Sequence, residues 1–138
     1  MPKVDQSILS NKDKITLDLS QILKSENILS HEDEIRPYET DALAAYKQKP
    51  LLVVLPETVE QVSEILKYCN ENRIKVVPRG AGTGLSGGAL PLADCVLLGM
   101  GKFNKILEID YQNKCVVLQP CVTNLAITNA VQDKKFYY

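Results

Sequence analysis

A dense group of glycines marks the segment PRGAGTGLSGGALP, which runs from Pro78 to Pro91. Five of the chain's seven glycines occupy nine consecutive positions within it, namely Gly80, Gly82, Gly84, Gly87 and Gly88. Because each glycine in a helix or strand costs about 0.5–1 kcal/mol relative to alanine, this density predicts a loop. The main-chain N–H groups of such a loop can converge on an anion, since no side chains block the approach. Arg79, Thr83 and Ser86 add side-chain donors, so the segment is a candidate anion-binding loop.

Two familiar phosphate-binding motifs fit this segment poorly. Gly82, Gly84 and Gly87 match G-x-G-x-x-G, the pattern of the Rossmann dinucleotide site. That site requires a helix that begins within the glycines, whereas Gly88 and Pro91 interrupt the residues where the helix would run. The phosphate loop of nucleotide hydrolases would need Lys and then Ser or Thr at positions where this sequence has glycine and alanine. What remains is an extended, helix-free loop whose backbone holds an anion.

A glycine-rich connection without a ligand is the alternative to a binding loop. A flexible linker normally carries more Ser, Asn, Asp or charged residues. Leu85, Ala89 and Leu90 instead indicate that this segment packs against other parts of the protein or against a ligand. The binding loop is therefore the preferred interpretation.

The residues before the glycine segment predict a β-α-β unit. The apolar run 51–55 (LLVVL), ended by Pro56, is typical of a strand buried on both faces. Thr58 and Gln61 can form a capping box for a helix that continues to about residue 70 with apolar residues at helical spacing. Residues 74–77 (IKVV) predict the next strand, directly before the glycines. A further strand is expected at residues 95–98, so the loop would connect two strands.

The first forty residues favour a helix followed by a connection. Within residues 1–25, the apolar residues Ile15, Leu19, Ile22 and Leu23 recur at the spacing of one helix face. Residues 25–40 are polar and irregular, which is typical of a connecting segment. We therefore expect an N-terminal helix whose apolar face is covered by another part of the protein.

The C-terminal third predicts a hairpin and a helix. Residues 106–111 and 115–118 favour two strands, and Asn113 in the turn between them is expected to take the left-handed conformation. Thr123 is expected to cap a helix that runs through Val131.

The overall composition is that of an ordinary globular protein. With 138 residues, 45% of them hydrophobic and 24% charged, the chain suits one domain with a single core. Its formal net charge of −1 gives no broad attraction to nucleic acid or anionic lipid. No apolar run has the length of a signal-peptide core or a membrane span, which favours a cytoplasmic protein without a membrane partner. The four cysteines form no C-x-x-C pair, which predicts unreactive reduced thiols and no metal site.

Four segments together resemble a known family: RPYETDAL (36–43), LLVVLPETVEQV (51–62), VVPRGAGTGLSGGALP (76–91) and LQPCVTNLAI (118–127). They are similar to the flavin-dependent oxidases and dehydrogenases of the vanillyl-alcohol oxidase type, which carry a PCMH-type FAD-binding domain. Within that family the sequence resembles the D subunit of bacterial glycolate oxidase and its D-lactate dehydrogenase relatives. The glycine stretch with its preceding β-α-β unit is the most specific part of the likeness. The family usually has glycine where this chain has Cys121, so a positive φ there would be strained.

The resemblance implies an α+β fold that is not a Rossmann sheet, with FAD as the cofactor. The FAD diphosphate would lie on the glycine loop, and the implied cofactor-binding residues are Pro56, Pro78, Arg79, Gly80, Ala81, Gly82, Thr83, Gly84, Leu85, Ser86, Gly87 and Gly88. The implied division is an N-terminal helical segment and connection at residues 1–45, and the N-terminal portion of the FAD-binding domain at residues 46–138. Tyr38 and Asp41 lie in a segment that the family shares. We interpret both as structural, with proximity to the cofactor as the alternative.

The resemblance also implies an activity. In the family the substrate is a 2-hydroxy acid, such as glycolate or D-lactate, whose Cα hydride passes to the flavin before the electrons leave to another acceptor. The family's catalytic base, substrate-binding arginines and metal-ligating histidines lie beyond the end of this chain, so no catalytic or metal-binding residue is predicted here. The implied function is the FAD-binding portion of such an oxidoreductase, inactive as this chain alone, with FAD and further oxidase subunits as partners. A stand-alone FAD-binding module and a non-functional fragment are the alternatives.

Overall fold

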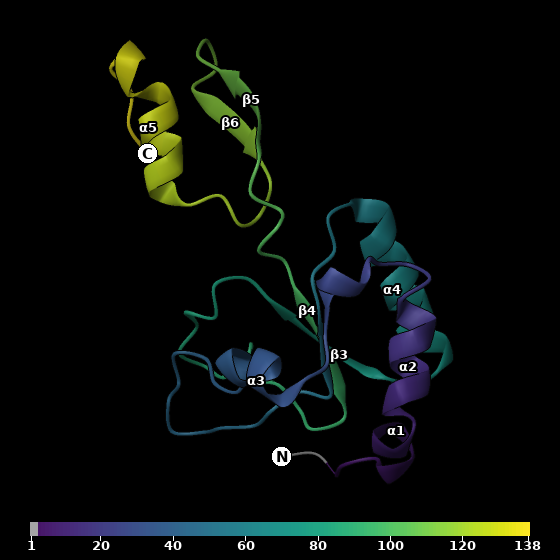
Figure 1. Cartoon of the computed structure of the whole chain (residues 1–138). Helices are drawn as coiled ribbons and strands as arrows, with labels where there is room; N and C mark the ends of the chain where they lie inside the picture. The colour runs from purple at the N-terminus through teal and green to yellow at the C-terminus, as the bar shows by residue number, and fades with distance from the viewer. Residues whose placement is uncertain (1–2) are drawn as a thin grey trace. The chain divides into compact units, whose positions relative to one another are not determined.

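The computed structural model describes residues 3–138 and divides the chain into two compact units (Figure 1). The first unit is Met1–Met100 and the second is Gly101–Tyr138, and each is described by itself. The division at residues 45 and 46 that the family resemblance implies stays a prediction.

A four-stranded sheet forms the centre of the first unit, in the order β1-β2-β4-β3. Its strands are β1 (Ile28–Leu29), β2 (Leu52–Val54), β3 (Lys75–Arg79) and β4 (Cys95–Gly99). β4 runs parallel to both β2 and β3, whereas β1 pairs antiparallel with β2. The predicted β-α-β unit is present, but β4, which comes later in the chain, lies between its two strands. The combination of helices with a mixed sheet confirms the predicted α+β class.

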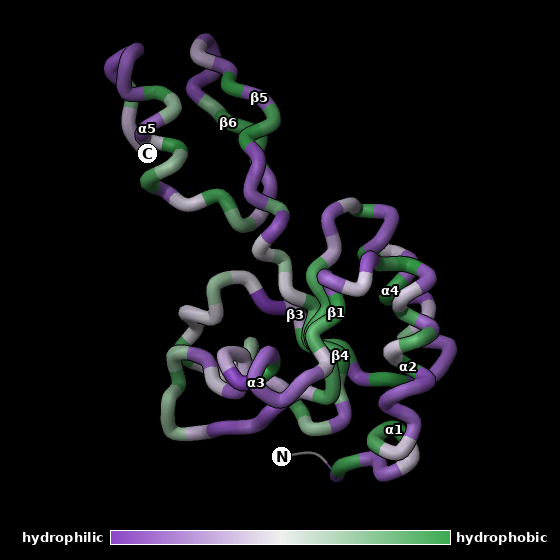
Figure 2. Tube along the Cα trace, viewed as in Figure 1, coloured by the Kyte–Doolittle hydropathy of each residue, from purple (hydrophilic) through white to green (hydrophobic). Residues whose placement is uncertain are grey.

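Both faces of this sheet are covered. One face packs against α1 (Gln6–Ser10), α2 (Lys12–Leu19) and α4 (Val59–Glu71), and the buried strand residues in that core are Ile28, Leu52, Val54, Val96 and Leu98. On the other face, Ile35 of α3 (Glu32–Ile35) packs with Val53 and Leu97. Figure 2 shows the strands as the most apolar part of this unit. Because successive side chains of a strand point to opposite faces, two covered faces explain why LLVVL is apolar throughout.

Side-chain caps fix where the long helix α4 begins. The Thr58 hydroxyl accepts a hydrogen bond from the main-chain N–H of Gln61 at 3.2 Å. The Gln61 side chain accepts in turn from the N–H of Glu57 at 2.8 Å, one residue earlier than in the standard capping box. The cap predicted at Thr58 is therefore confirmed, with this small shift in its second hydrogen bond.

The first forty residues form more secondary-structure elements than the sequence predicts. The expected N-terminal helix is two helices, α1 and α2, with Asn11 between them, although Ile15, Leu19 and Leu23 are buried as expected. The expected connection at residues 25–40 contains β1, α3 and two short 3-10 helices, η1 (Ser25–Asn27) and η2 (Arg36–Tyr38).

A buried carboxylate ties the start of the chain to the sheet. Asp94 is 2% exposed, and its Oδ2 accepts hydrogen bonds from the N–H of Asp5 at 2.7 Å and from Lys75 Nζ at 2.5 Å. Burial alone would raise the pKa of Asp94, but the hydrogen bonds from Lys75 and Asp5 outweigh it and lower the pKa below the usual value. The ionised carboxylate is therefore the form that the fold stabilises.

The substitution Asp94→Asn is expected to lower the free energy of unfolding by about 2 kcal/mol near neutral pH, because two hydrogen bonds to a charged acceptor are weakened. Since the folded pKa is lowered, this stabilisation is present above the unfolded value of about 4 and is lost as the pH falls through the folded value. Urea unfolding at a series of pH values measures it. Asp33→Asn, at an exposed position of α3, is the control. Equal stability of the two variants near neutral pH would contradict the role given to Asp94.

The second unit contains a hairpin and a helix. β5 (Ile106–Asp110) and β6 (Cys115–Leu118) pair antiparallel, and α5 (Asn124–Val131) is followed by η3 (Gln132–Lys134). The hydroxyl of Thr123 accepts from the N–H of Ala126 at 3.2 Å, which confirms the cap predicted there.

One local prediction for this unit is wrong, and one possible source of strain is absent. In the hairpin turn the left-handed residue is Lys114, with φ of 54°, because Asn113 instead donates two hydrogen bonds to the carboxylate of Asp110. Within residues 3–138, the non-glycine residues with positive φ are Arg73, Lys114 and Lys135. Cys121 is not among them, so the strain considered for its backbone does not arise.

Candidate cofactor site

The glycine loop leaves the sheet at the carboxyl end of β3. No residue between Arg79 and Cys95 belongs to a helix or strand, which confirms the predicted helix-free loop. Since β2 and β3 both run parallel to β4, the carboxyl ends of β2 and β3 lie at the same edge of the sheet. Pro56, two residues after β2, is buried at this edge. The edge formed by the carboxyl ends of parallel strands is where α/β proteins commonly bind ligands.

The backbone of the loop offers a set of unused donors. Within residues 3–138, no main-chain N–H of residues 81–89 donates a hydrogen bond to another protein group. Most of these residues are exposed, among them Thr83 and Ser86, whose hydroxyls are additional donors. Gly82 and Gly87 have φ of 72° and 74°, a conformation that other residues rarely adopt. The loop can therefore direct several N–H groups at one anion.

Two other glycines leave space that the protein itself does not use. A Cβ added at Gly84 or at Gly88 would have no other protein atom within 4 Å, and neither glycine has a positive φ. Packing and backbone conformation within the described chain thus do not account for glycine at these positions. A ligand backbone or phosphate that approaches the loop closely would account for it. The donor set and this open space together fit the diphosphate of a dinucleotide.

Arg79 has a structural role that the sequence did not predict. Its Nη1 donates to the carbonyl oxygens of Tyr38 at 3.3 Å and Thr40 at 2.7 Å, and its guanidinium carbon lies 5.6 Å from the centre of the Tyr38 ring. A Cβ on Gly82 would collide with this guanidinium. Arg79 therefore holds residues 38–40 beside the loop, and its contact with the cofactor stays a prediction.

The neighbouring segment, residues 38–43, contacts the loop at two more places. The N–H of Ala42 donates to the carbonyl oxygen of Gly82 at 2.9 Å. The Leu43 side chain lies 3.5 Å from the position that a Cβ of Gly87 would take. We call residues 38–43 the clasp segment. Neither periodicity nor motif spacing signalled this contact, since about forty residues separate the two segments in the sequence.

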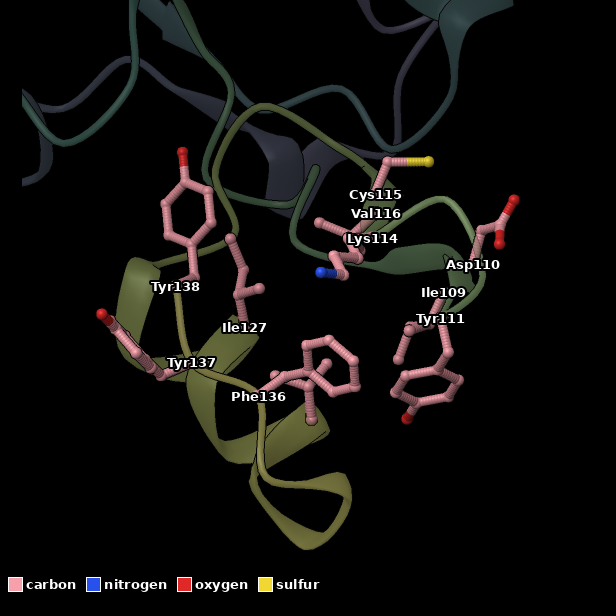
Figure 3. Close-up of a pocket in the computed structure, with 11 residues that line it drawn as sticks. Ile109, Asp110, Tyr111, Lys114, Cys115, Val116, Ile127, Phe136, Tyr137 and Tyr138 are labelled. Atoms are coloured by element: carbon pink, nitrogen blue, oxygen red, sulfur yellow. The ribbon is translucent and has the colours of Figure 1, made fainter.

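The small cavity of the second unit is no candidate for a cofactor site. The second unit has a cavity of about 80 Å³ between its hairpin, α5 and the C-terminal residues, lined in part by Ile109, Val116, Ile127 and Phe136 (Figure 3). This volume is far too small for a flavin and suits the interior of a small core.

The cysteines differ in their surroundings. Cys69 and Cys95 are fully buried, and burial raises the pKa of each thiol to about 11, which makes the reactive thiolate rare at neutral pH. Cys115 is exposed. Among residues 3–138, no group of three or more His, Cys, Asp or Glu side chains is placed to hold a metal ion. In the same part of the chain, no helix is both long and apolar enough to cross a membrane.

The fold and the loop define a class of protein, an α+β domain in which a glycine loop with unused main-chain N–H groups lies at the carboxyl ends of parallel strands. A family model described as "FAD binding domain" matches residues 50–138, and the chain belongs to this family. FAD is accordingly the cofactor of the domain. The chain is 46% identical to glycolate oxidase subunit GlcD of Escherichia coli (strain K12) over 138 residues, which is 100% of this chain and 26% of the relative.

Other relatives and solved structures agree with this assignment. The mitochondrial D-2-hydroxyglutarate dehydrogenase of Arabidopsis thaliana is 39% identical over 90 residues, which cover 65% of this chain and 16% of the relative. A structure of p-cresol methylhydroxylase with bound substrate superposes with a TM-score of 0.78 at 28% identity, covering 96% of this chain and 26% of that one. A 4-ethylphenol oxidase from Gulosibacter chungangensis gives 0.80 at 25% identity, with the same coverage. The chain spans about a quarter, or less, of the length of these proteins.

Proposed function

We propose that this chain is the FAD-binding portion of a flavin-dependent oxidoreductase that oxidises a 2-hydroxy acid such as glycolate or D-lactate. The observation that carries the proposal is the row of unused main-chain N–H groups at residues 81–89, beside two glycines that leave open space. Bound FAD supplies the electron acceptor for such an oxidation.

The proposed work of the chain's own residues is to bind and orient the diphosphate. Hydrogen bonds to a charged acceptor contribute about 1.5–3 kcal/mol each, so three or four loop donors offset the cost of ordering a glycine-rich segment. The hydroxyls of Thr83 and Ser86 supplement the backbone donors. Pro56 is proposed to border the cofactor from the neighbouring strand end, because it lies at the same edge of the sheet.

The substrate class is proposed from the relatives. Glycolate and D-2-hydroxyglutarate, which appear in the names of two of them, are both 2-hydroxy acids. Nothing in residues 3–138 is assigned a catalytic role, so we propose that this chain binds FAD but does not turn over substrate by itself. The cytoplasmic location expected from the sequence stays a prediction, which fractionation of the producing cells tests.

Two measurements test the proposed function. Titration of FAD with the purified chain is expected to quench flavin fluorescence to saturation, and an absence of quenching would overturn the proposed cofactor role. A chimera in which this chain replaces the matching quarter of E. coli glycolate oxidase subunit GlcD is then expected to oxidise glycolate. If that chimera binds FAD but leaves glycolate, D-lactate and D-2-hydroxyglutarate untouched, the proposed substrate class is wrong.

A further inference from the structure

Asp41 in the clasp segment has an oxygen that the folded chain does not use. The residue is 6% exposed, and its Oδ1 accepts a hydrogen bond from the N–H of Leu43 at 2.9 Å. Its Oδ2 is buried and has no hydrogen-bond partner in the part of the chain that the structure describes. A buried carboxylate oxygen without a donor loses its hydration without compensation, and such atoms are rare enough to need an explanation.

The surroundings of Asp41 supply candidate donors. Thr40, on one side of Asp41, accepts a hydrogen bond at its carbonyl from Arg79, the last residue of β3 before the loop. Ala42, on the other side, donates its N–H to the carbonyl of Gly82 in the loop. The main-chain N–H groups of residues 81–89 have no protein acceptor within residues 3–138. Asp41 Oδ2 therefore lacks a donor, and the main-chain N–H groups of residues 81–89 lack acceptors. The clasp segment, which contains Asp41, is hydrogen-bonded to this loop.

We propose that Asp41 is a positioning residue of the cofactor site, and that its Oδ2 accepts a main-chain N–H of the glycine loop when the loop closes on the FAD diphosphate. Solvent does not reach Oδ2, so a protein group that moves is a better donor than a ligand atom. Gly82 and Gly87 give the loop the backbone freedom that such a shift requires. A hydrogen bond from one loop N–H to the Asp41 carboxylate would fix the orientation of that peptide unit. The N–H groups of the adjoining peptide units would then face the diphosphate.

Substitution of Asp41 is expected to affect FAD binding and thermal stability in opposite ways. The substitution Asp41→Asn keeps an oxygen for the N–H of Leu43 but places a neutral amide where Oδ2 was. The chain without FAD is expected to melt at an unchanged or higher temperature, because the buried carboxylate oxygen that has no donor is removed. The dissociation constant for FAD is expected to rise about tenfold, because the loop loses its acceptor. Repulsion between the carboxylate and the diphosphate would instead make the variant bind FAD more tightly.

The experiment combines thermal melting of the FAD-free chain with FAD titration followed by flavin fluorescence. Glu39→Gln is the matched control, because it removes one negative charge from the same segment at a half-buried side chain that is paired, at 3.6 Å, with the exposed Lys47. The result expected is weaker FAD binding by Asp41→Asn alone, without loss of thermal stability. Unchanged or tighter binding by Asp41→Asn would overturn the proposal, and so would a parallel fall in melting temperature and affinity.

A measurement on the unsubstituted chain covers the case in which the variant does not fold. Saturation with FAD is expected to produce a scalar coupling across a hydrogen bond, between a loop amide nitrogen and Cγ of Asp41, that is absent without FAD. Absence of this coupling in the FAD-bound chain would overturn the proposal. The inference rests on the proposed cofactor role of the loop. If the unsubstituted chain binds no FAD the proposed function itself fails, whereas normal FAD binding by Asp41→Asn removes only the role of Asp41.

Discussion

The double substitution Gly84→Val and Gly88→Val is expected to weaken FAD binding by about 100-fold or more while leaving the stability of the FAD-free chain nearly unchanged. Added side chains at these two positions would meet no protein atom within 4 Å, and neither glycine needs a positive φ. The valine side chains would instead occupy the space through which the diphosphate reaches the backbone. A 100-fold loss is about 2.7 kcal/mol, which corresponds to one or two hydrogen bonds to a charged acceptor.

A matched control distinguishes the effect of valine in the loop from the effect of replacing any glycine by valine. Gly101 also has open space around its Cβ position and no positive φ, and it belongs to the second unit. Gly101→Val is therefore expected to leave FAD affinity within about twofold of the unsubstituted chain, since surface substitutions usually change free energies by about 0.5 kcal/mol or less. Fluorescence titration gives the affinities, and urea unfolding gives the stabilities. Equal FAD affinity in all three proteins would remove the loop from the cofactor site.

The largest effect on stability is expected from Leu97→Ala, which should lower the free energy of unfolding by about 3 kcal/mol. Leu97 is fully buried at the centre of β4, paired with Val53 on one side and Val77 on the other. Its side chain packs in the smaller core with Ile35 and Val53, so its truncation leaves a cavity there. Because β4 joins β2 to β3, this core also holds together the sheet edge that bears the loop.

Leu107→Ala provides the comparison, because Leu107 lies in β5 of the second unit with 60% of its surface exposed. Urea unfolding of both variants is expected to show a loss of about 0.5 kcal/mol or less for Leu107→Ala. Losses of similar size in the two variants would mean that the sheet of the first unit does not depend on the packing around Leu97.

The elements that the sequence predicts correctly are those set by local chemistry. The run LLVVL, the cap at Thr58 and the cap at Thr123 each depend on residues within a few positions of one another. The two-residue strand β1 was missed because it is too short to show a period and is held only by its pairing with β2. The insertion of β4 between β2 and β3 also depends on long-range pairing. The hairpin turn was misassigned because the side chain of Asn113 found a partner in Asp110.

The candidate site also combines a feature that the local sequence predicts with long-range contacts that it does not predict. The glycine loop could be predicted because its composition by itself disfavours both a helix and a strand. Pro56 was implied only by the family resemblance, and its contact with the cofactor stays a prediction. The contact of the clasp segment with the loop could not be predicted from spacing, since it joins Arg79 to Thr40 and Gly82 to Ala42. The family resemblance of residues 36–43 was the one signal that the segment mattered, and it did not indicate where the segment lies.

On this proposal the main-chain N–H groups of residues 81–89 hold the FAD diphosphate. The most direct test follows the amide resonances of the labelled chain in proton–nitrogen correlation spectra as FAD is added. The amides of residues 81–89 are expected to shift and to saturate at the FAD concentration that saturates fluorescence quenching, whereas riboflavin, which lacks the diphosphate, should leave them in place. FAD that binds while these amides stay unchanged would contradict the claim.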